Sequence, residues 1–326
     1  MKKILTGLKP TGDLTLGNYI GSIKLMKNLE GNYESYMFVA DLHALTVPND
    51  PVLLHERIRK FIGMYLACGI DPTKHTIYLQ SENPYIPAIS WLLECSTYYG
   101  EASRMIQFKE KSKQNANFTV GLLTYPILMA ADILYCDADL VPVGIDQKQH
   151  VELARDIADR FNKKYGEAFT LPDVYINESG AKIYDLQDPT KKMSKTEENP
   201  KGVISLFDDP EVAKSKIMKA TTDSLGIIKY DPLNQPGISN LLVIASVLSG
   251  TTIDSIVKDF EGKGYGDFKK YVAEIVGNFL TDIQSKYNDI MSSGKVDEIL
   301  DNGKNVTTKI AKDKYEKLSK LMGVCR

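Results

Sequence analysis

The chain has 326 residues, 43% of them hydrophobic and 25% charged, which is enough to bury a large core and favours two domains over one. The formal net charge of -2 excludes a global basic field, so any contact with nucleic acid must come from a local basic patch. There is no signal-peptide pattern, and no apolar run approaches the roughly 20 residues of a membrane span, so we expect a cytoplasmic protein without a membrane segment.

Strand-like and helix-like patterns alternate over the first 80 residues. An apolar run ends in a Gly/Pro-rich turn and is followed by apolar residues at helical spacing, and this unit recurs. The expected elements are, in chain order, strand 3–8, helix 14–29, strand 36–45, helix 51–68 and strand 76–79. Strands that alternate with helices predict an α/β fold with a parallel sheet.

Helical patterns dominate from residue 87 onward. Residues 87–135 read as a helical insertion, after which a strand over 139–143 and a helix over 147–165 resume the earlier pattern. Beyond about residue 200 strands nearly vanish and long amphipathic helices take over. We therefore expect an α/β domain over 1–200 and an all-helical C-terminal domain over 201–326.

The cysteines and histidines give no support for a metal site. Cys68, Cys95, Cys136 and Cys325 are widely spaced and form no Cys-x-x-Cys pair, so we expect buried free thiols. The four histidines are not paired at metal-ligand spacing. No protein-bound metal is expected.

Residues 9–18, with the sequence Lys-Pro-Thr-Gly-Asp-Leu-Thr-Leu-Gly-Asn, connect the first expected strand to the first helix. Gly12 and Gly17 permit a close backbone approach, and the start of a helix favours negative charge. Thr15 and Asn18 can donate hydrogen bonds to phosphate oxygens. The segment favours a phosphate-bearing ligand, with an ordinary capped turn as the alternative.

Residues 188–196, with the sequence Asp-Pro-Thr-Lys-Lys-Met-Ser-Lys-Thr, place three lysines and several hydroxyl groups in a Pro-bounded stretch that we expect to be a mobile loop. Negative charge builds on the departing pyrophosphate when a triphosphate is cleaved between its α and β phosphates. A cationic loop that closes over this charge stabilises it. A solvated charged loop is the alternative.

The first of these segments resembles the HIGH signature of class I aminoacyl-tRNA synthetases, and the second resembles their KMSKS signature, in the same order and at a similar separation. Segments 121–134 and 142–150 look like the bacterial tryptophanyl branch of that family, and the resemblance covers essentially the whole chain. It implies a Rossmann-like nucleotide-binding domain with a helical insertion around 87–135. It also implies a homodimer that activates L-tryptophan with ATP and Mg²⁺ and then transfers it to tRNA(Trp).

Asp132 is the only charged residue in the apolar segment 121–134, which we expect to be a helix broken near Pro126. A carboxylate in such surroundings needs a partner. An indole ring has an apolar body and one N–H donor, so a single acceptor within apolar walls suits it. The alternative is an Asp on a helix face, paired with an arginine.

The resemblance also assigns roles to individual residues. By resemblance, the tryptophan site comprises Asp132, Met129, Tyr125, Gln147, Val141, Val143 and His43. The ATP site comprises Lys9, Pro10, Thr11, Gly17, Asn18, Gly144, Ile145, Asp146, Ile183, Lys192, Met193, Ser194, Lys195 and Thr196. The catalytic residues are Lys192, Lys195, Lys111, Thr15 and Asn18. For Asp146 the alternative is a simple helix cap.

The chain departs from the family pattern at several positions. Thr15 and Asn18 replace both histidines of the HIGH signature, Lys9 stands where glutamine is common, and Thr196 replaces the last serine of KMSKS. A tyrosyl-tRNA synthetase and a catalytically silent RNA-binding or metabolite-binding paralogue are the rival interpretations. The lysine-rich stretch 309–320 offers either a contact to tRNA within a domain expected to read the anticodon or a solvated helix face.

Overall fold

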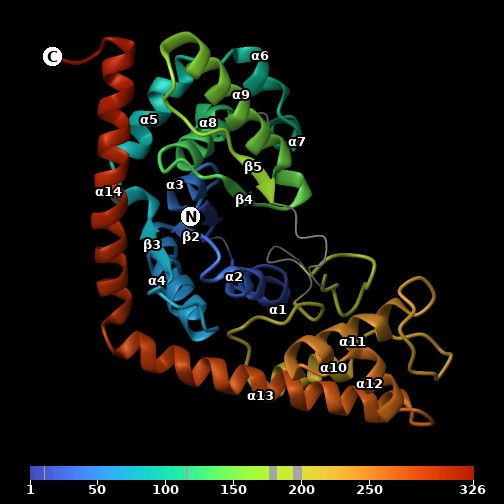
Figure 1. Ribbon diagram of the computed structural model, residues 1–326. Helices are drawn as coiled ribbons and strands as arrows, with labels where there is room; N and C mark the ends of the chain where they lie inside the picture. The colour runs from blue at the N-terminus through green and yellow to red at the C-terminus, as the bar shows by residue number, and fades with distance from the viewer. Residues whose placement is uncertain (11, 115–116, 176–181, 194–199) are drawn as a thin grey trace.

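The computed structural model describes the whole chain except residues 11, 115–116, 176–181 and 194–199 (Figure 1). Its described residues contain one sheet of five parallel strands in the order β3-β2-β1-β4-β5. The strands are β1 (Lys3–Leu8), β2 (Glu34–Val39), β3 (His75–Leu79), β4 (Leu140–Pro142) and β5 (Asp173–Tyr175). The predicted α/β fold with a parallel sheet is confirmed.

Two details of the sheet differ from expectation. The strand expected over 36–45 ends at Val39, because its pairing with β1 and β3 stops there and the chain turns into helix α3 (Asp41–Ala44). Strand β5 was not expected, since three residues are too few to show an alternating pattern.

Helices make up most of the remaining described chain. Up to β5 they are α1 (Leu16–Asn18), the π-helix η1 (Tyr19–Ile23), α2 (Lys24–Leu29), α3, α4 (Pro51–Ala67), the 3₁₀ turn η2 (Gln80–Glu82), α5 (Tyr85–Glu94), α6 (Tyr99–Arg104), α7 (Ile106–Gln114), α8 (Val120–Leu134), the 3₁₀ turn η3 (Ile145–Gln147) and α9 (Lys148–Tyr165). They are followed by α10 (Pro210–Met218), α11 (Pro236–Ser249), α12 (Ile253–Asp259), α13 (Tyr265–Ser292) and α14 (Lys295–Met322).

Helix α8 runs through Pro126 without the expected break. A proline inside a helix removes one backbone hydrogen bond and crowds the preceding turn. Pro126 is buried, and α8 packs against both α5 and α9. Tertiary packing on two sides therefore outweighs the local cost, and it keeps Asp132 on a continuous helix.

Both faces of the sheet are covered, because alternate residues of β2 enter different apolar cores. Met37 and Val39 join a core with helices α4, α11 and α13, whereas Tyr36 and Phe38 join a core with α5, α8 and α9. This alternation is what the two-residue period of a strand dictates. A sheet buried on both faces is the usual state of a parallel sheet.

Helices α13 and α14 connect the helices α10 and α11 to the sheet and to α5. Helix α13 packs against α10, α11 and α4, and α14 then returns along the sheet to contact β3 and α5 (Figure 1). Gly303 permits this approach, because a Cβ there would lie 1.8 Å from the carbonyl oxygen of Ile77. The division into domains at about residue 200 stays a prediction, since α14 lies beyond it in sequence but packs on the sheet.

Lys314 shows that the lysine-rich stretch 309–320 is not uniformly solvated. Its ammonium group is bonded to both carboxylate oxygens of Asp137 at 2.8 and 2.7 Å and to the carbonyl oxygen of Ala168 at 2.8 Å. Only 8% of this lysine is exposed, and burial lowers its pKa. Lys314 therefore holds α14 against the segments that follow α8 and α9 and does not face solvent.

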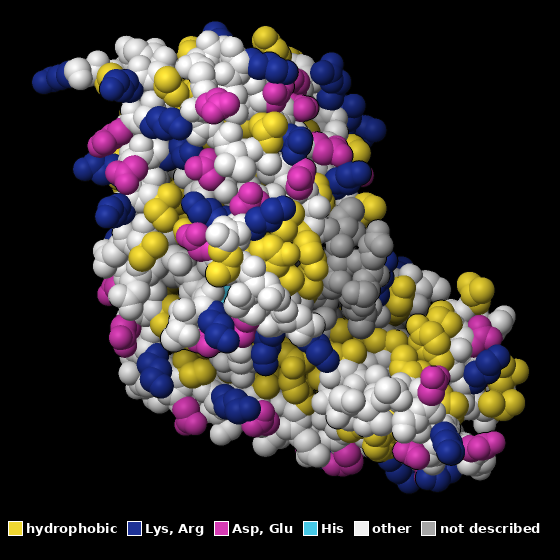
Figure 2. Space-filling model, in the orientation of Figure 1, with side chains coloured by type: hydrophobic (Ala, Val, Ile, Leu, Met, Phe, Trp, Pro, Cys, Tyr) yellow, Lys and Arg dark blue, Asp and Glu magenta, His cyan; other side chains and the backbone are white. Residues whose placement is uncertain are grey.

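Apolar surface gathers on the lobe that α10–α12 form (Figure 2). In the loop between α10 and α11, Leu225, Ile227 and Leu233 are exposed by 60%, 63% and 92%. Two of the four cysteines, Cys95 and Cys325, are also exposed, which corrects the expectation of four buried thiols. Cys95 ends α5, and Cys325 follows the last helix.

Within the described ranges, no single helix is both long enough and apolar enough to cross a membrane. Helices α11 and α12 meet that criterion only as a pair, and they are bent by 109° where they join.

Candidate active site

A cavity of about 300 Å³ lies at the carboxyl ends of β1, β2 and β4. Strands β1 and β4 are neighbours in the sheet although β2 and β3 come between them in sequence, so the crossover direction reverses at this point. Ligands of open α/β sheets bind at such a switch point. All seven residues expected in the tryptophan site line this cavity: His43, Tyr125, Met129, Asp132, Val141, Val143 and Gln147.

Asp132 is completely buried and its carboxylate is held by two side chains. His43 Nε2 lies 2.9 Å from Asp132 Oδ2, and Gln80 Nε2 donates to Oδ1 at 2.9 Å and to Oδ2 at 2.8 Å. Burial raises the pKa of Asp132, while the hydrogen bonds from His43 and Gln80 lower it. The arginine partner considered as an alternative is absent from these contacts.

Tyr125 and His150 form a second polar pair at the cavity. The Tyr125 hydroxyl and His150 Nε2 lie 2.9 Å apart and share a hydrogen bond, and burial lowers the pKa of His150 to about 4, which leaves its ring neutral at pH 7. Burial also raises the pKa of Tyr125 to about 12, so its phenol stays protonated. This hydrogen bond fixes the ring of Tyr125 beside the cavity.

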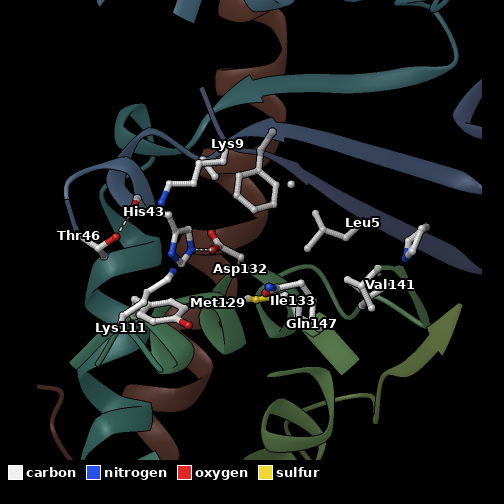
Figure 3. A pocket seen from close by; sticks show the side chains of 16 residues that line it. Leu5, Lys9, His43, Thr46, Lys111, Met129, Asp132, Ile133, Val141 and Gln147 are labelled. Atoms are coloured by element: carbon white, nitrogen blue, oxygen red, sulfur yellow. Dashed lines mark hydrogen bonds and ion pairs between the residues drawn. The ribbon is translucent and has the colours of Figure 1, made fainter. Parts of the chain in front are cut away.

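Lys9 and Lys111 line the same cavity, and their ammonium groups point toward the His43 ring from opposite sides (Figure 3). Burial and the charge of Lys111 lower the pKa of Lys9. Lys111 also lies over the ring of Tyr125, with 5.5 Å between its Nζ and the ring centroid. Two cations therefore converge at one end of the cavity, opposite the apolar walls formed by Leu5 and Val141.

The structure brings the two expected phosphate-handling segments together. A Cβ on Gly17 would lie 3.2 Å from the carbonyl oxygen of Met193, although 176 positions separate them in sequence. Residues 14–16 also pair with residues 204–206, through hydrogen bonds such as Leu16 N to Ile204 O at 2.9 Å. The absence of a side chain on Gly17 thus eases a close contact between the two segments.

Thr15 and Asn18 take the role of a capped turn. The Thr15 hydroxyl donates to Asn18 Oδ1 at 3.1 Å and caps the backbone N–H of Asn18 at 3.3 Å, and Thr15 is only 2% exposed. The hydroxyl of Thr15 is therefore engaged within the turn, whereas Asn18 is half-buried. Pro10 is buried beside this turn.

The lysine-rich segment 188–196 is described only in part. Ile183 and Met193 are buried and joined by a hydrogen bond from Met193 N to Ile183 O at 2.9 Å, and Lys192 pairs with Tyr184 in an isolated bridge while remaining exposed. Four of the expected ATP-site residues lie outside the described residues, namely Thr11, Ser194, Lys195 and Thr196.

Gly144, Ile145 and Asp146 form the loop that follows β4. All three are exposed, and Asp146 accepts a hydrogen bond from Gln147 Nε2 at 2.8 Å. Gln147 itself lines the cavity, so this loop lies at its rim. A Cβ on Gly144 would lie 2.6 Å from Asp146 Oδ1, the end of an exposed side chain that can rotate away.

Several residues that line the cavity, or that bond a residue lining it, were not singled out from the sequence. Gln80 is the most informative, since it is completely buried and bonds Asp132, yet it follows β3 in a stretch without a recognisable motif. The others supply apolar or backbone surface and one hydroxyl: Leu5, Gly7, Phe38, Ala40, Thr46, Ile133 and Pro142. Most of them lie in or just after parallel strands, and that position is the signal that points to them.

Comparison with known proteins gives a consistent family. The family model described as tRNA synthetases class I (W and Y) matches residues 1–281. The chain is 49% identical over 323 residues to the Tryptophan--tRNA ligase of Bacillus subtilis, covering 99% of this chain and 98% of that protein. It is 47% identical over 326 residues to the enzyme of the same name from Bacillus anthracis, covering 100% and 99%.

Solved structures agree with this assignment. The tryptophanyl-tRNA synthetase of Mycoplasma pneumoniae has a TM-score of 0.88 and 38% identity, covering 100% of this chain and 98% of that one. The Campylobacter jejuni tryptophanyl-tRNA synthetase complexed with ADP and tryptophan has a TM-score of 0.86 and 36% identity, with 98% and 99% covered. The chain belongs to the class I tRNA synthetase family of the tryptophan and tyrosine (W and Y) enzymes.

Proposed function

We propose that the chain is a tryptophan–tRNA ligase, which activates L-tryptophan with ATP and transfers it to tRNA(Trp). The observation that carries this proposal is the buried Asp132 carboxylate, which lines the cavity between the His43 ring and the apolar walls formed by Leu5 and Val141 (Figure 3). A phenol would need polar groups placed for its hydroxyl, whereas an indole needs one acceptor for its N–H. Full-length relatives named Tryptophan--tRNA ligase support this interpretation over the tyrosyl alternative.

The indole is proposed to bind between Met129, Val141 and Val143, with its N–H directed to Asp132. Among the described donors, Oδ1 of Asp132 accepts a hydrogen bond only from Gln80, so it keeps a lone pair for the indole. A substrate without that N–H leaves this remaining acceptor position of a buried carboxylate without a partner, and unpaired buried polar groups cost on the order of 10⁴–10⁵ in discrimination at strongly selective sites. Tyr125, Gln147 and His43 are proposed to hold the amino-acid end.

In the first step, the tryptophan carboxylate attacks the α-phosphorus of ATP. The carboxylate oxygen forms the new P–O bond, the bond to the β-phosphate oxygen breaks, and pyrophosphate leaves with its negative charge. No nucleophile from the protein is needed, so catalysis rests on positioning and on charge stabilisation. Lys111 and Lys9 converge at the cavity, and they are proposed to act with Lys192 and Lys195 on the phosphates.

Residues of the turn 9–18 and of the loop after β4 complete the proposed ATP site. Asp146 is proposed to accept hydrogen bonds from the ribose hydroxyl groups, and Ile183 to contact adenine through its backbone. The approach of Gly17 to Met193 supports a single nucleotide site built from both segments. Because Thr15 is engaged with Asn18, its proposed catalytic contribution is to hold the turn.

Magnesium is proposed to arrive with ATP and to neutralise part of the phosphate charge. No group of three His, Cys, Asp or Glu side chains that could hold a metal ion occurs in the described part of the chain. Phosphate oxygens and water, the usual ligands of nucleotide-bound Mg²⁺, would therefore supply its coordination.

In the second step, the terminal adenosine of tRNA(Trp) attacks the adenylate. The helical lobe after residue 200 and the exposed lysines of α14 are proposed to contact the tRNA, with Lys314 excluded because it is buried against Asp137. We further propose a cytoplasmic homodimer. Exposed apolar side chains on α5 to α8 support an interface there, with Trp91, Tyr99 and Val120 exposed by 64%, 76% and 75%.

Amino-acid-dependent exchange of labelled pyrophosphate into ATP tests the proposed function. Tryptophan is expected to support exchange, while tyrosine and phenylalanine are not, and transfer is expected to require tRNA(Trp). Exchange with tyrosine alone would establish the tyrosyl alternative. The absence of exchange with every amino acid would support the catalytically silent paralogue.

A further inference from the structure

We infer that Gln80 is a positioning residue that determines specificity for the indole N–H by fixing the orientation of Asp132. The inference rests on the proposed activation of tryptophan and extends it to a residue that does not line the cavity. Gln80 begins the 3₁₀ turn after β3, and its side chain reaches Asp132 on α8, 52 positions away in sequence.

The contact between Gln80 and Asp132 has an unusual form. A single amide nitrogen, Gln80 Nε2, lies 2.9 Å from Oδ1 and 2.8 Å from Oδ2 of Asp132, so it faces both carboxylate oxygens. His43 Nε2 then approaches Oδ2 alone, at 2.9 Å. This asymmetry leaves Oδ1 with fewer donors than Oδ2 and marks Oδ1 as the acceptor for a ligand.

Gln80 has no competing role among the described residues. It is 0% exposed, and its Oε1 has no hydrogen-bond partner in the described part of the chain. Rotating the amide by 180° would place Oε1 against a carboxylate, so the observed orientation is the favourable one. Leaving Oε1 buried without a partner costs free energy of folding. The hydrogen bonds from Nε2 to Asp132 offset part of that cost, and a role in positioning Asp132 accounts for the rest.

The buried carboxylate of Asp41 holds Gln80 in place relative to His43, the other side chain that bonds Asp132. Asp41 Oδ1 accepts the backbone N–H of Ser81, the residue after Gln80, and the backbone N–H of Leu42, the residue before His43, each at 3.0 Å. The two side chains that hold Asp132 are therefore joined through one atom of Asp41. Asp41 thereby links the turn after β3, which carries Gln80, to helix α3, which carries His43.

The electrostatics of the site agree with this role. Burial raises the pKa of Asp132, and the donated hydrogen bonds from His43 and Gln80 oppose that rise. A protonated Asp132 has one hydroxyl oxygen and one carbonyl oxygen, so it is a weaker acceptor for the indole N–H than the carboxylate. Removing Gln80 therefore both loosens the acceptor and favours its neutral form.

The test compares tryptophan with 3-(3-benzothienyl)alanine, in which sulfur replaces the indole N–H. For the full-length protein, kcat/KM in pyrophosphate exchange is measured with each amino acid, and the ratio of the two values reports recognition of the N–H. Gln80→Met is expected to lower this ratio about tenfold, the effect of one hydrogen bond to a charged group. The value for the sulfur analogue is expected to change by less than about twofold.

Gln235→Met is the matched control. Gln235 is also a buried glutamine whose Nε2 faces both oxygens of an aspartate, Asp223, at 3.4 and 3.3 Å, but it lies in the helical lobe. This variant is expected to lose stability and keep the wild-type ratio. If the ratio in Gln80→Met equals the wild-type ratio, whether both kcat/KM values fall together or neither falls, the positioning role is refuted.

Gln80→Glu keeps the shape and covers the case in which the methionine variant fails to fold. Two facing carboxyl groups share one proton at low pH, so a donor to Asp132 survives there and is lost as the pH rises. The ratio is expected to fall with rising pH in this variant and to stay flat in the wild type. A flat ratio in Gln80→Glu refutes the inference, whereas a wild type inactive with tryptophan refutes the proposed function itself.

Discussion

Replacing Asp132 with asparagine conserves the shape of the side chain and exchanges one carboxylate oxygen for an NH₂ group. The surrounding donors make this small change severe. If the NH₂ group takes the place of Oδ2, it meets His43 Nε2 and Gln80 Nε2, and if it takes the place of Oδ1, it meets Gln80 Nε2 and the indole N–H. Either orientation sets donor against donor.

The magnitude follows from the contacts. Each orientation leaves at least one buried donor without its acceptor and removes a hydrogen bond to a charged group, which together cost about 2–4 kcal/mol. In the transition state this corresponds to a loss of roughly 30- to 1,000-fold in kcat/KM for tryptophan. Phenylalanine has no ring N–H, so its much lower kcat/KM is expected to change little.

The assay is pyrophosphate exchange with tryptophan, tyrosine and phenylalanine, accompanied by urea unfolding of each variant. Asp137→Asn serves as the control, because Asp137 pairs with Lys314 outside the cavity and affects stability without touching the ligand. If Asp132→Asn discriminates between tryptophan and phenylalanine as well as the wild type does, Asp132 is structural and the proposed recognition of indole is wrong.

Three further predictions concern charge, pH and packing. Lys111→Met is expected to slow adenylate formation about 100-fold in single-turnover experiments and to change the Kd of tryptophan far less, because the charge it meets arises in the transition state. Since the folded-state pKa of His150 is about 4, below the unfolded value of 6.5, the free energy of unfolding should fall by roughly 3 kcal/mol from pH 7 to pH 4 through this group, and urea unfolding of His150→Gln should lack that contribution. Gly303→Ala is expected to cost about 3 kcal/mol in thermal unfolding, because the new Cβ meets the backbone of Ile77, whereas Gly266→Ala in open space on α13 should cost almost nothing.

Each of these predictions can fail clearly. Equal losses of rate and of tryptophan affinity in Lys111→Met would place this lysine in ground-state binding. Parallel pH dependences for the wild type and His150→Gln would show that His150 is not held neutral by the fold. A Gly303→Ala variant as stable as the wild type would mean that α14 adjusts easily against β3.

The sequence by itself predicted most of the alternation of strands and helices and singled out two candidate phosphate-handling segments, because periodicity, turns and motifs are local properties. It also pointed to Asp132, since a lone charge in an apolar helix is visible without a fold. All seven residues expected around tryptophan line one cavity, whereas four of the expected ATP-site residues lie outside the described residues.

Only the tertiary structure identified the groups that hold Asp132 and showed which residues, expected to be exposed, are in fact buried. Gln80 approaches Asp132 because parallel strands bring their carboxyl ends together, and no local pattern encodes that distance. For the same reason Lys314, which reads as a solvated lysine in a basic helix, turned out to be buried against Asp137 and Ala168. Local chemistry fixes what a segment is able to do, and long-range packing decides which partners it meets.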